Sequence, residues 1–317
     1  MKRTMLSCMA ALLSVPALAL AQGSPTIRMV LGVPPGGSAD ATARIVASRM
    51  QEVMKRSVIV ENRAGANMLI ATKLVSGSAP DGSTLLMATA GPMTTNPVFY
   101  PKEPVNPLTN LTPISMIVTS PLAVMVNADL PLKSLRELVT YAKANPGQLN
   151  YSTGTTSFQI AMEMLMQETG IRLTHVPYGG AAPALNAVAA GQVQLTILDI
   201  GTSKALIRAG KLRVLMMLSD KRVKSLPDVP SAVESGFPRL EMDTWVAVFG
   251  PPGMPPALVG QLNDAMAKAM DHSEVREKFA AMEFEPLYLT PEQLAERIKR
   301  DSATFKEVIE RANLKPN

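Results

Sequence analysis

Thr26-Ile27-Arg28-Met29-Val30-Leu31 is a short apolar run that leads through Pro34-Pro35-Gly36-Gly37 into segment 40–56. The run has the composition of a buried strand, and the paired prolines and glycines end it. Segment 40–56 carries apolar residues at the three- and four-residue spacing of an amphipathic helix. A strand, a tight turn and a helix are therefore predicted in this order.

The same alternation continues along the chain. Strand, helix and strand in succession build a mainly parallel sheet covered by helices, so an α/β fold is predicted. The first unit continues with a strand at 58–61, a helix at 68–76 and a strand at 84–90. The second unit contains predicted helices at 133–144, 157–169 and 181–190 and predicted strands at 149–152, 171–176, 193–198 and 212–218.

The length of 317 residues exceeds what one hydrophobic core usually supports, so two lobes are expected. Two apolar runs on either side of Ser120-Pro121 could form one bent segment that crosses between them. A second crossing is expected near residue 243, after which helices at 255–271, 273–282 and 291–312 return to the first lobe. The predicted division is 22–121 plus 243–317 for the first lobe and 122–242 for the second.

The N-terminus has the pattern of a secretory signal. Lys2 and Arg3 are followed by an uncharged stretch at 5–20, and Ala19-Leu20-Ala21 matches the small-x-small cleavage pattern. An uncleaved anchor is the alternative, but the apolar run is short for a span of about 20 residues. Segment 1–21 is therefore predicted to be a cleaved signal peptide, which places the mature protein in the periplasm.

The composition narrows the function. Hydrophobic residues make up 47% of the chain and charged residues 18%, as in a globular protein. The formal net charge of +5 is small and scattered, so no nucleic-acid partner is expected. The single cysteine, Cys8, lies in the predicted signal, which leaves the mature chain no thiol for a disulfide, a nucleophile or a metal.

Catalytic signatures are not found in the sequence. The histidines are His175, at the end of a predicted buried strand, and His272, in a charged helix, and neither has a second ligand at metal spacing. The chain has no Gly-x-Ser-x-Gly elbow, no phosphate loop with a Gly-Lys-Ser/Thr ending and no dinucleotide fingerprint. No catalytic residue, metal or cofactor is therefore expected.

The turn between the first strand and helix is a candidate binding loop. Its glycines allow close approach of a ligand to the backbone, and the free amides at a helix start favour an anion. Ser38 or Asp40 could cap the helix, and an ordinary capped turn is an equally good interpretation. A β-branched residue at Gly37 is expected to resist a positive φ.

A second candidate loop, Tyr151-Ser152-Thr153-Gly154-Thr155-Thr156-Ser157-Phe158, follows a strand in the other lobe. Its hydroxyls and backbone amides could donate several hydrogen bonds to a carboxylate. A plain capped loop is the alternative, but one such loop in each lobe favours a ligand in the cleft between them. Weaker candidates are the loop at 63–67, the turn at 177–180 and Asp199, whereas Trp245 and the methionines are assigned to the core.

Short motifs across nearly the whole predicted mature chain resemble the Bug proteins, the extracytoplasmic receptors of tripartite tricarboxylate transporters. The matching segments are Val33-Pro34-Pro35-Gly36-Gly37-Ser38-Ala39-Asp40 with Ala43-Arg44, Val60-Glu61-Asn62-Arg63-Ala64-Gly65-Ala66, Pro80-Asp81-Gly82-Ser83-Thr84-Leu85-Leu86, Asn96-Pro97 with Tyr100-Pro101, Val176-Pro177-Tyr178-Gly179-Gly180, Gly191-Gln192-Val193, Gly210-Lys211-Leu212-Arg213, and Leu226-Pro227-Asp228-Val229-Pro230 with Glu234-Ser235-Gly236.

This resemblance implies a two-lobed, type II-like periplasmic binding fold with two crossovers, and a small carboxylate held in the cleft by backbone amides and hydroxyls. It implies a monomer that delivers its ligand to the membrane subunits of a transporter; a receptor that signals without transport is the alternative. The ligand residues implied are Pro35, Gly36, Gly37, Ser38 and Asp40, then Gly65, Ala66 and Asn67, then Ser152, Thr153, Gly154, Thr155, Thr156 and Ser157, with Asp199 completing the wall.

The chain departs from the family pattern in two of these loops. Asn67-Met68-Leu69 stands where the family commonly continues with glycines, and Thr155-Thr156-Ser157-Phe158 replaces a segment that often contains serine and histidine. The sequence therefore does not identify the carboxylate.

Overall fold

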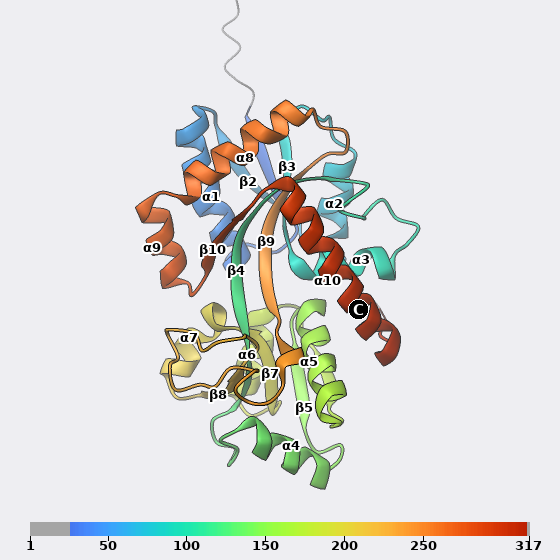
Figure 1. Cartoon of the computed structure of the whole chain (residues 1–317), viewed down its shortest axis with the longest axis vertical. Helices are drawn as coiled ribbons and strands as arrows, with labels where there is room; N and C mark the ends of the chain where they lie inside the picture. The colour runs from blue at the N-terminus through green and yellow to red at the C-terminus, as the bar shows by residue number, and fades with distance from the viewer. Residues whose placement is uncertain (1–25, 316–317) are drawn as a thin grey trace, which may run out of the picture.

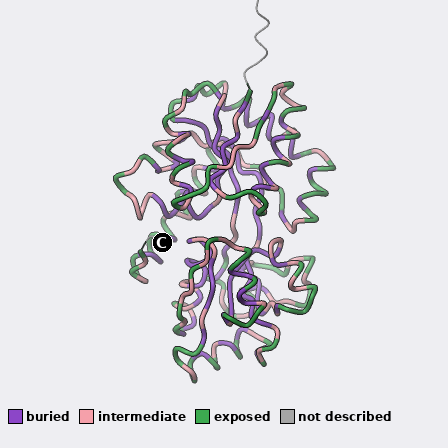
Figure 2. The backbone as a smooth tube through the Cα atoms, turned by 180° about the vertical axis from the view of Figure 1, so that it is seen from behind, coloured by how far each residue is buried: buried purple, intermediate pink, exposed green. Residues whose placement is uncertain are grey.

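The computed structural model describes residues 26–315, so the predicted signal peptide at 1–21 lies outside the described residues. The chain forms two lobes, one above the other, joined by two long strands (Figure 1). Ten strands form one hydrogen-bonded sheet that runs through both lobes. In each lobe the buried residues follow the strands at the centre, and the exposed residues follow the covering helices and loops (Figure 2).

The upper lobe is a sheet with helices on both faces. Its central parallel strands, β1 (Ile27–Leu31) and β3 (Thr84–Thr89), are buried nearly throughout, as expected for strands covered on both sides. β2 (Val58–Asn62) lies outside β1. The covering helices are α1 (Ser38–Met54), α8 (Pro256–Met270) and α9 (Ser273–Ala281) on one face and α2 (Leu69–Ser76) and α3 (Ala90–Phe99) on the other.

The lower lobe repeats the arrangement with fewer strands. β5 (Asn150–Thr153) lies parallel to β6 (Thr174–Pro177) and to β7 (Leu195–Asp199), and β8 (Leu212–Met217) completes the sheet. Its helices are α4 (Leu135–Ala144), α5 (Thr156–Thr169), α6 (Ala181–Ala189) and α7 (Ile200–Arg208), and a short 3-10 turn, η1, covers Pro238–Leu240.

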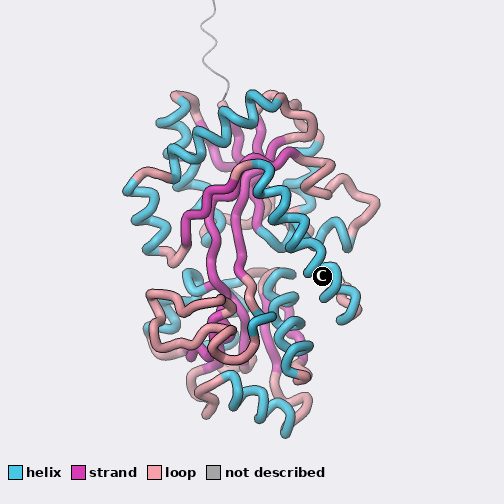
Figure 3. Tube along the Cα trace, viewed as in Figure 1, coloured by secondary structure: helices cyan, strands magenta, loops and turns pink. Residues whose placement is uncertain are grey.

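Two strands cross between the lobes (Figure 3). β4 (Thr112–Asn127) pairs with β9 (Asp243–Gly250) in the upper lobe and with β7 and β8 in the lower lobe. The pairing changes between Pro121 and Leu122, because Pro121 is the last residue of β4 opposite β9. The two apolar runs on either side of Ser120-Pro121 are thus one strand, as the sequence allowed.

The C-terminal helix α10 (Pro291–Ala312) bridges the lobes (Figure 1). Leu294 and Ile298, in its first half, pack into the core of the upper lobe, and β10 (Glu285–Leu289) pairs with β4 there. Phe305 and Val308, in its second half, belong to the core of the lower lobe. The sequence assigned the whole helix to the upper lobe; the structure shows that its apolar stripe is shared between the two cores.

Candidate functional site

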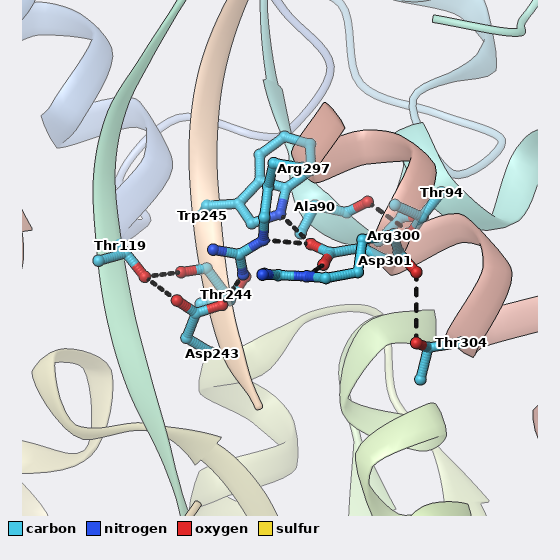
Figure 4. A network of polar contacts seen from close by, with 11 residues as sticks. Ala90, Thr94, Thr119, Asp243, Thr244, Trp245, Arg297, Arg300, Asp301 and Thr304 are labelled. Atoms are coloured by element: carbon cyan, nitrogen blue, oxygen red, sulfur yellow. Dashed lines mark hydrogen bonds and ion pairs between the residues drawn. The ribbon is translucent and has the colours of Figure 1, made fainter. Parts of the chain in front are cut away.

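The two crossing strands and α10 are tied together by a buried charged cluster (Figure 4). Arg297 of α10 forms ion pairs with Asp301, at 2.7 Å, and with Asp243 of β9. The Asp243 carboxylate also bonds Thr119 of β4, and the indole of Trp245 donates to Asp301 at 2.9 Å. The side chains of Arg297 and Asp301 are 15% and 12% exposed, so this ion pair is largely buried at the junction of the two lobes.

Two cavities lie between the lobes. The larger, of about 850 Å³, is lined by the hinge cluster, the loop at 218–225 and residues 280–285, and most of its charged groups are paired within the protein. The smaller cavity, of about 210 Å³, is lined by residues of predicted binding loops from both lobes. Its lining comprises Asn67, Phe99 and Tyr100 from the upper lobe and Thr153, Gly154, Thr155, Thr156, Tyr178 and Gly179 from the lower lobe.

The loop at 35–40 connects β1 to α1 as predicted, but its capping differs. Gly37 is the N-cap residue, and no side chain caps the helix, so neither Ser38 nor Asp40 has the expected role. Gly36 has the positive φ, at 92°, whereas φ of Gly37 is −85°; the left-handed position is therefore one residue earlier than the sequence indicated. Pro35, Gly36 and Gly37 are exposed, and none of residues 35–40 lines the smaller cavity.

Asp40 is buried and holds this loop in shape. Its carboxylate accepts hydrogen bonds from the Gly36 amide, from Asn62 and, through both oxygens, from Arg44. Burial raises the pKa of Asp40, but the bonds from Arg44, Gly36 and Asn62 outweigh burial and leave the pKa below its ordinary value. The carboxylate thus stays ionised and positions the loop, while the amides at the start of α1 remain open.

The loop at 65–67 precedes α2 and has an unusual backbone. Gly65, Ala66 and Asn67 all have positive φ, and so does Met68, the N-cap residue of α2. Asn67 lines the smaller cavity and exchanges hydrogen bonds with Asn96 of α3. Asn67 of this predicted loop thus lines the same cavity as the lower-lobe loop at 153–156.

In the loop at 152–157, some side chains form hydrogen bonds within the protein and others line the smaller cavity. The Ser152 hydroxyl donates to the Ala184 carbonyl at 3.0 Å, and the hydroxyls of Thr155 and Ser157 bond each other at 3.1 Å. Gly154 packs so closely on Gly180 that an added Cβ would lie 2.1 Å from its carbonyl carbon. Within residues 26–315 the Thr156 hydroxyl has no hydrogen-bond partner, which leaves it available to a ligand.

Thr153 contacts a histidine that the sequence did not place near the site. Its hydroxyl lies 2.7 Å from Nε2 of His175, and the His175 ring stacks on Tyr151 with centroids 4.9 Å apart. Burial lowers the pKa of His175, so the ring is neutral at pH 7. The stacking of the two rings arises because β5 and β6 place Tyr151 and His175 opposite each other.

Asp199 is the N-cap residue of α7. Its carboxylate accepts from the Thr202 amide at 2.8 Å and from the Thr202 hydroxyl at 2.9 Å. Burial raises the pKa of this carboxyl above its ordinary value, against the opposing effect of the Thr202 bonds. Asp199 lines neither cavity between the lobes; its side chain points to its own helix.

Helix α3 is the part of the site that sequence reasoning missed. Phe99 and Tyr100, at its end, line the smaller cavity, and Gly91, at its start, meets Ser157: an added Cβ would lie 2.8 Å from the Ser157 hydroxyl. Asn96-Pro97 and Tyr100-Pro101 were noted as motifs only. Gly91, Pro92 and Pro97 conceal the helix in the sequence, because glycine and proline are poor helix formers.

Most helices that begin at the loops between the two lobes have no side-chain cap at the N-terminus. No side chain caps α1, α2, α3, α5 or α6, whereas Ser134 and Thr290 cap α4 and α10. α8 and α9 also lack a side-chain cap, but they begin on the outer surface of the upper lobe (Figure 1). Of these uncapped helices, α5 begins in the lining of the smaller cavity, and its positive end favours an anionic ligand there.

Residues 26–315 contain no group of three or more histidine, cysteine, aspartate or glutamate side chains that could hold a metal ion. No helix in this part of the chain is long and apolar enough to span a membrane.

Comparison with known proteins identifies the family. Residues 42–314 match the model of the tripartite tricarboxylate transporter family receptor. The chain is 34% identical to the protein BugT of Bordetella pertussis over 288 residues, which cover 89% of this chain and 88% of BugT. The structure of R. palustris Rpa4515 with adipate is 30% identical and superposes with a TM-score of 0.85 over 93% of this chain and 100% of that one. MatC from Rhodopseudomonas palustris, with bound malate, is 26% identical, with a TM-score of 0.80 over 90% of this chain and 99% of MatC. The chain belongs to the family of tripartite tricarboxylate transporter receptors.

Proposed function

We propose that this protein is a periplasmic receptor that binds a small carboxylate between its lobes and delivers it to the membrane subunits of a tripartite tricarboxylate transporter. The observation that carries the proposal is the smaller cavity, where the Thr156 hydroxyl and the uncapped start of α5 face Asn67 of the other lobe. Helix-end amides and hydroxyls are donors, and a carboxylate accepts from both. Adipate and malate in two structural relatives have the same chemistry.

The ligand contacts are assigned by geometry. Thr155, Thr156 and Asn67 are proposed to contact the ligand directly, with the amides at the start of α5. The loop at 35–40 is proposed to join them as the lobes close, because its amides are open and Asp40 holds its shape. Asp199 is proposed to contribute to binding only indirectly, because it caps α7 and so fixes where that helix begins.

Binding is proposed to occur without chemical change. Thr153 and His175 form the one hydroxyl–histidine pair among the residues around the smaller cavity, but Thr153 is 2% exposed and its hydroxyl is directed at the ring. An activated nucleophile also needs a third group that orients its base, and His175 has no such partner among residues 26–315. We therefore expect acids incubated with the protein to be recovered unchanged; turnover that Thr153→Val abolishes would contradict this.

Calorimetry of the purified mature protein tests the binding function. Succinate, malate, glutarate, adipate, benzoate and aspartate are titrated in turn, and at least one is expected to bind with a 1:1 stoichiometry. Folded protein that binds none of these acids would contradict the proposal. Uptake of the bound acid by cells that carry the transporter subunits, with and without the receptor, then separates transport from a purely sensory role.

A further inference from the structure

The segment 65–68 is the longest left-handed stretch of the described chain. Positive φ angles of 45°, 48° and 65° at Ala66, Asn67 and Met68 account for three of the six such non-glycine residues within 26–315. The others, Lys55, Glu283 and Asn313, are isolated. A left-handed backbone is unfavourable for residues with a Cβ, and it persists only where surrounding contacts enforce it.

Contacts from α2 and α3 enforce this backbone. The Asn96 side chain donates to the Asn67 carbonyl at 2.9 Å, while Asn67 donates to Asn96 Oδ1 at the same distance. The Thr72 hydroxyl and amide both donate to the Met68 carbonyl at 3.0 Å. These bonds fix the direction of the Met68 side chain, since its Cα is held on both sides.

The Met68 side chain lies over the carboxyl ends of two neighbouring parallel strands. It is 2% exposed, and a Cβ added to Gly32, just after β1, would lie 2.6 Å from its Cγ and 2.8 Å from its Cε. Its sulfur is 3.7 Å from the hydroxyl of Thr89, the last residue of β3. Ligands of open α/β sheets bind at this edge. Met68 packs in the upper-lobe core and lines neither cavity between the lobes, but it follows Asn67, which lines the smaller one.

From this geometry we propose that Met68 limits the length of the bound acid. The thioether fills the upper-lobe end of the cleft, so the ligand extends only from the α5 loop to Asn67. An acid with two more methylene groups would need the space that Met68 occupies. This inference rests on the proposed carboxylate-binding function and adds the residue that selects short acids over long ones.

The experiment compares succinate, glutarate and adipate, measured by calorimetry with wild type, Met68→Gly and Met68→Ala. The wild type is expected to bind succinate most tightly. In Met68→Gly the ratio of adipate to succinate affinity is expected to rise by about tenfold or more, because a methylene group in a fitted pocket changes affinity by that order. Met68→Ala is expected to show a smaller rise. Glycine also suits the left-handed φ at this position.

Two variants serve as controls. Met50→Ala removes an equally buried methionine from α1 on the opposite face of the sheet, and its length preference is expected to match the wild type. Adding Gly32→Ala to Met68→Gly returns a methyl group to the vacated space and is expected to restore part of the preference for succinate.

Each outcome is decisive. Binding with the same length preference in wild type and both Met68 variants would overturn the role of Met68 and leave the receptor function standing. Silence of every variant toward all three acids would overturn the selection of acid length by Met68, whereas silence toward all six acids of the panel above would overturn the receptor function as well. If the variants do not fold, NMR spectra of the wild-type protein with methyl-labelled methionine provide the measurement. The Met68 methyl resonance should then shift on saturation with succinate while that of Met50 does not, and an unchanged Met68 resonance would refute the inference.

Discussion

Asn67 and Asn96 form a reciprocal pair of hydrogen bonds between the α2 loop and helix α3. Asn96 is fully buried, and each bond measures 2.9 Å. The pair connects a cavity-lining residue to the last turn of α3, which supplies Phe99 and Tyr100 to the same cavity. The upper-lobe wall of the site is thus one hydrogen-bonded unit rather than two independent loops.

Replacement of Asn96 by alanine should destabilise the unliganded protein. The change removes both bonds and leaves the Asn67 carbonyl without its partner, which costs about 1–3 kcal/mol of unfolding free energy. Urea denaturation measures the difference. Thr95→Val is the matched control, because the buried Thr95 hydroxyl has no partner among residues 26–315, so its loss should be neutral or stabilising. Equal changes in the free energy of unfolding for the two variants would contradict the stabilising role of the Asn67–Asn96 bonds.

Removal of the Arg297 side chain should lower the free energy of unfolding more than removal of any single surface ion pair would. Arg297→Leu removes the largely buried cation between the carboxylates of Asp243 and Asp301, at a cost of about 3 kcal/mol. These carboxylates then keep only their bonds from Thr119, Trp245 and the exposed Arg300. Arg300→Leu, on the same helix, removes a side chain that is 69% exposed and should change stability by less than about 0.5 kcal/mol. Chemical denaturation of both variants checks the difference, and similar losses would show that the buried cluster is not special.

Asp199→Asn should stabilise the protein at neutral pH. Burial raises the folded-state pKa of Asp199, so its favourable contribution is complete below the unfolded pKa and is lost as pH rises through the folded pKa. Asparagine still caps α7 but carries no charge. Thermal melting of both proteins between pH 4 and pH 7 should show a gain in stability at pH 7 that shrinks as the pH falls.

Asp40→Asn should show the opposite pH dependence in the same melting experiments. Despite burial, its hydrogen bonds lower the folded-state pKa of Asp40, so its contribution is present at neutral pH and is lost as pH falls through that value, below about 3.8. The variant should therefore be less stable than wild type at pH 7, and the deficit should fade in strong acid. A matching sign for the two aspartates would contradict the burial and bonding described for them.

Thr156→Val should weaken binding of the preferred acid without loss of stability. The hydroxyl lines the cavity and has no partner within residues 26–315, so the change removes a bond to a charged ligand worth about 1.5–3 kcal/mol, or roughly tenfold to a hundredfold in Kd. Ser38→Ala should melt as the wild type does, since Gly37 is the N-cap residue. Calorimetry and melting of both variants check this, and unchanged affinity with Thr156→Val would exclude its hydroxyl from the site.

The periodic parts of the fold could be predicted closely. The predicted helices at 40–56, 255–271 and 291–312 correspond to α1, α8 and α10 within two residues at each end. Helix α7 was missed, and α3 was missed although both of its ends belong to the cleft. Local propensity opposes α3, which contains two prolines, and packing against α5, α10 and β9 overcomes it.

The sequence by itself determined most strands and helices, the family and the glycine- and hydroxyl-rich loops, because these depend on residues close together in the chain; β10 was not predicted. Tertiary structure alone decided which loops meet. Asn67 and Thr156 line one cavity, Asp40 and Asp199 turn to their own helices, and Met68 covers Gly32. Such contacts join residues far apart in sequence, and their geometry follows from how the strands, helices and lobes pack together, which no local pattern encodes.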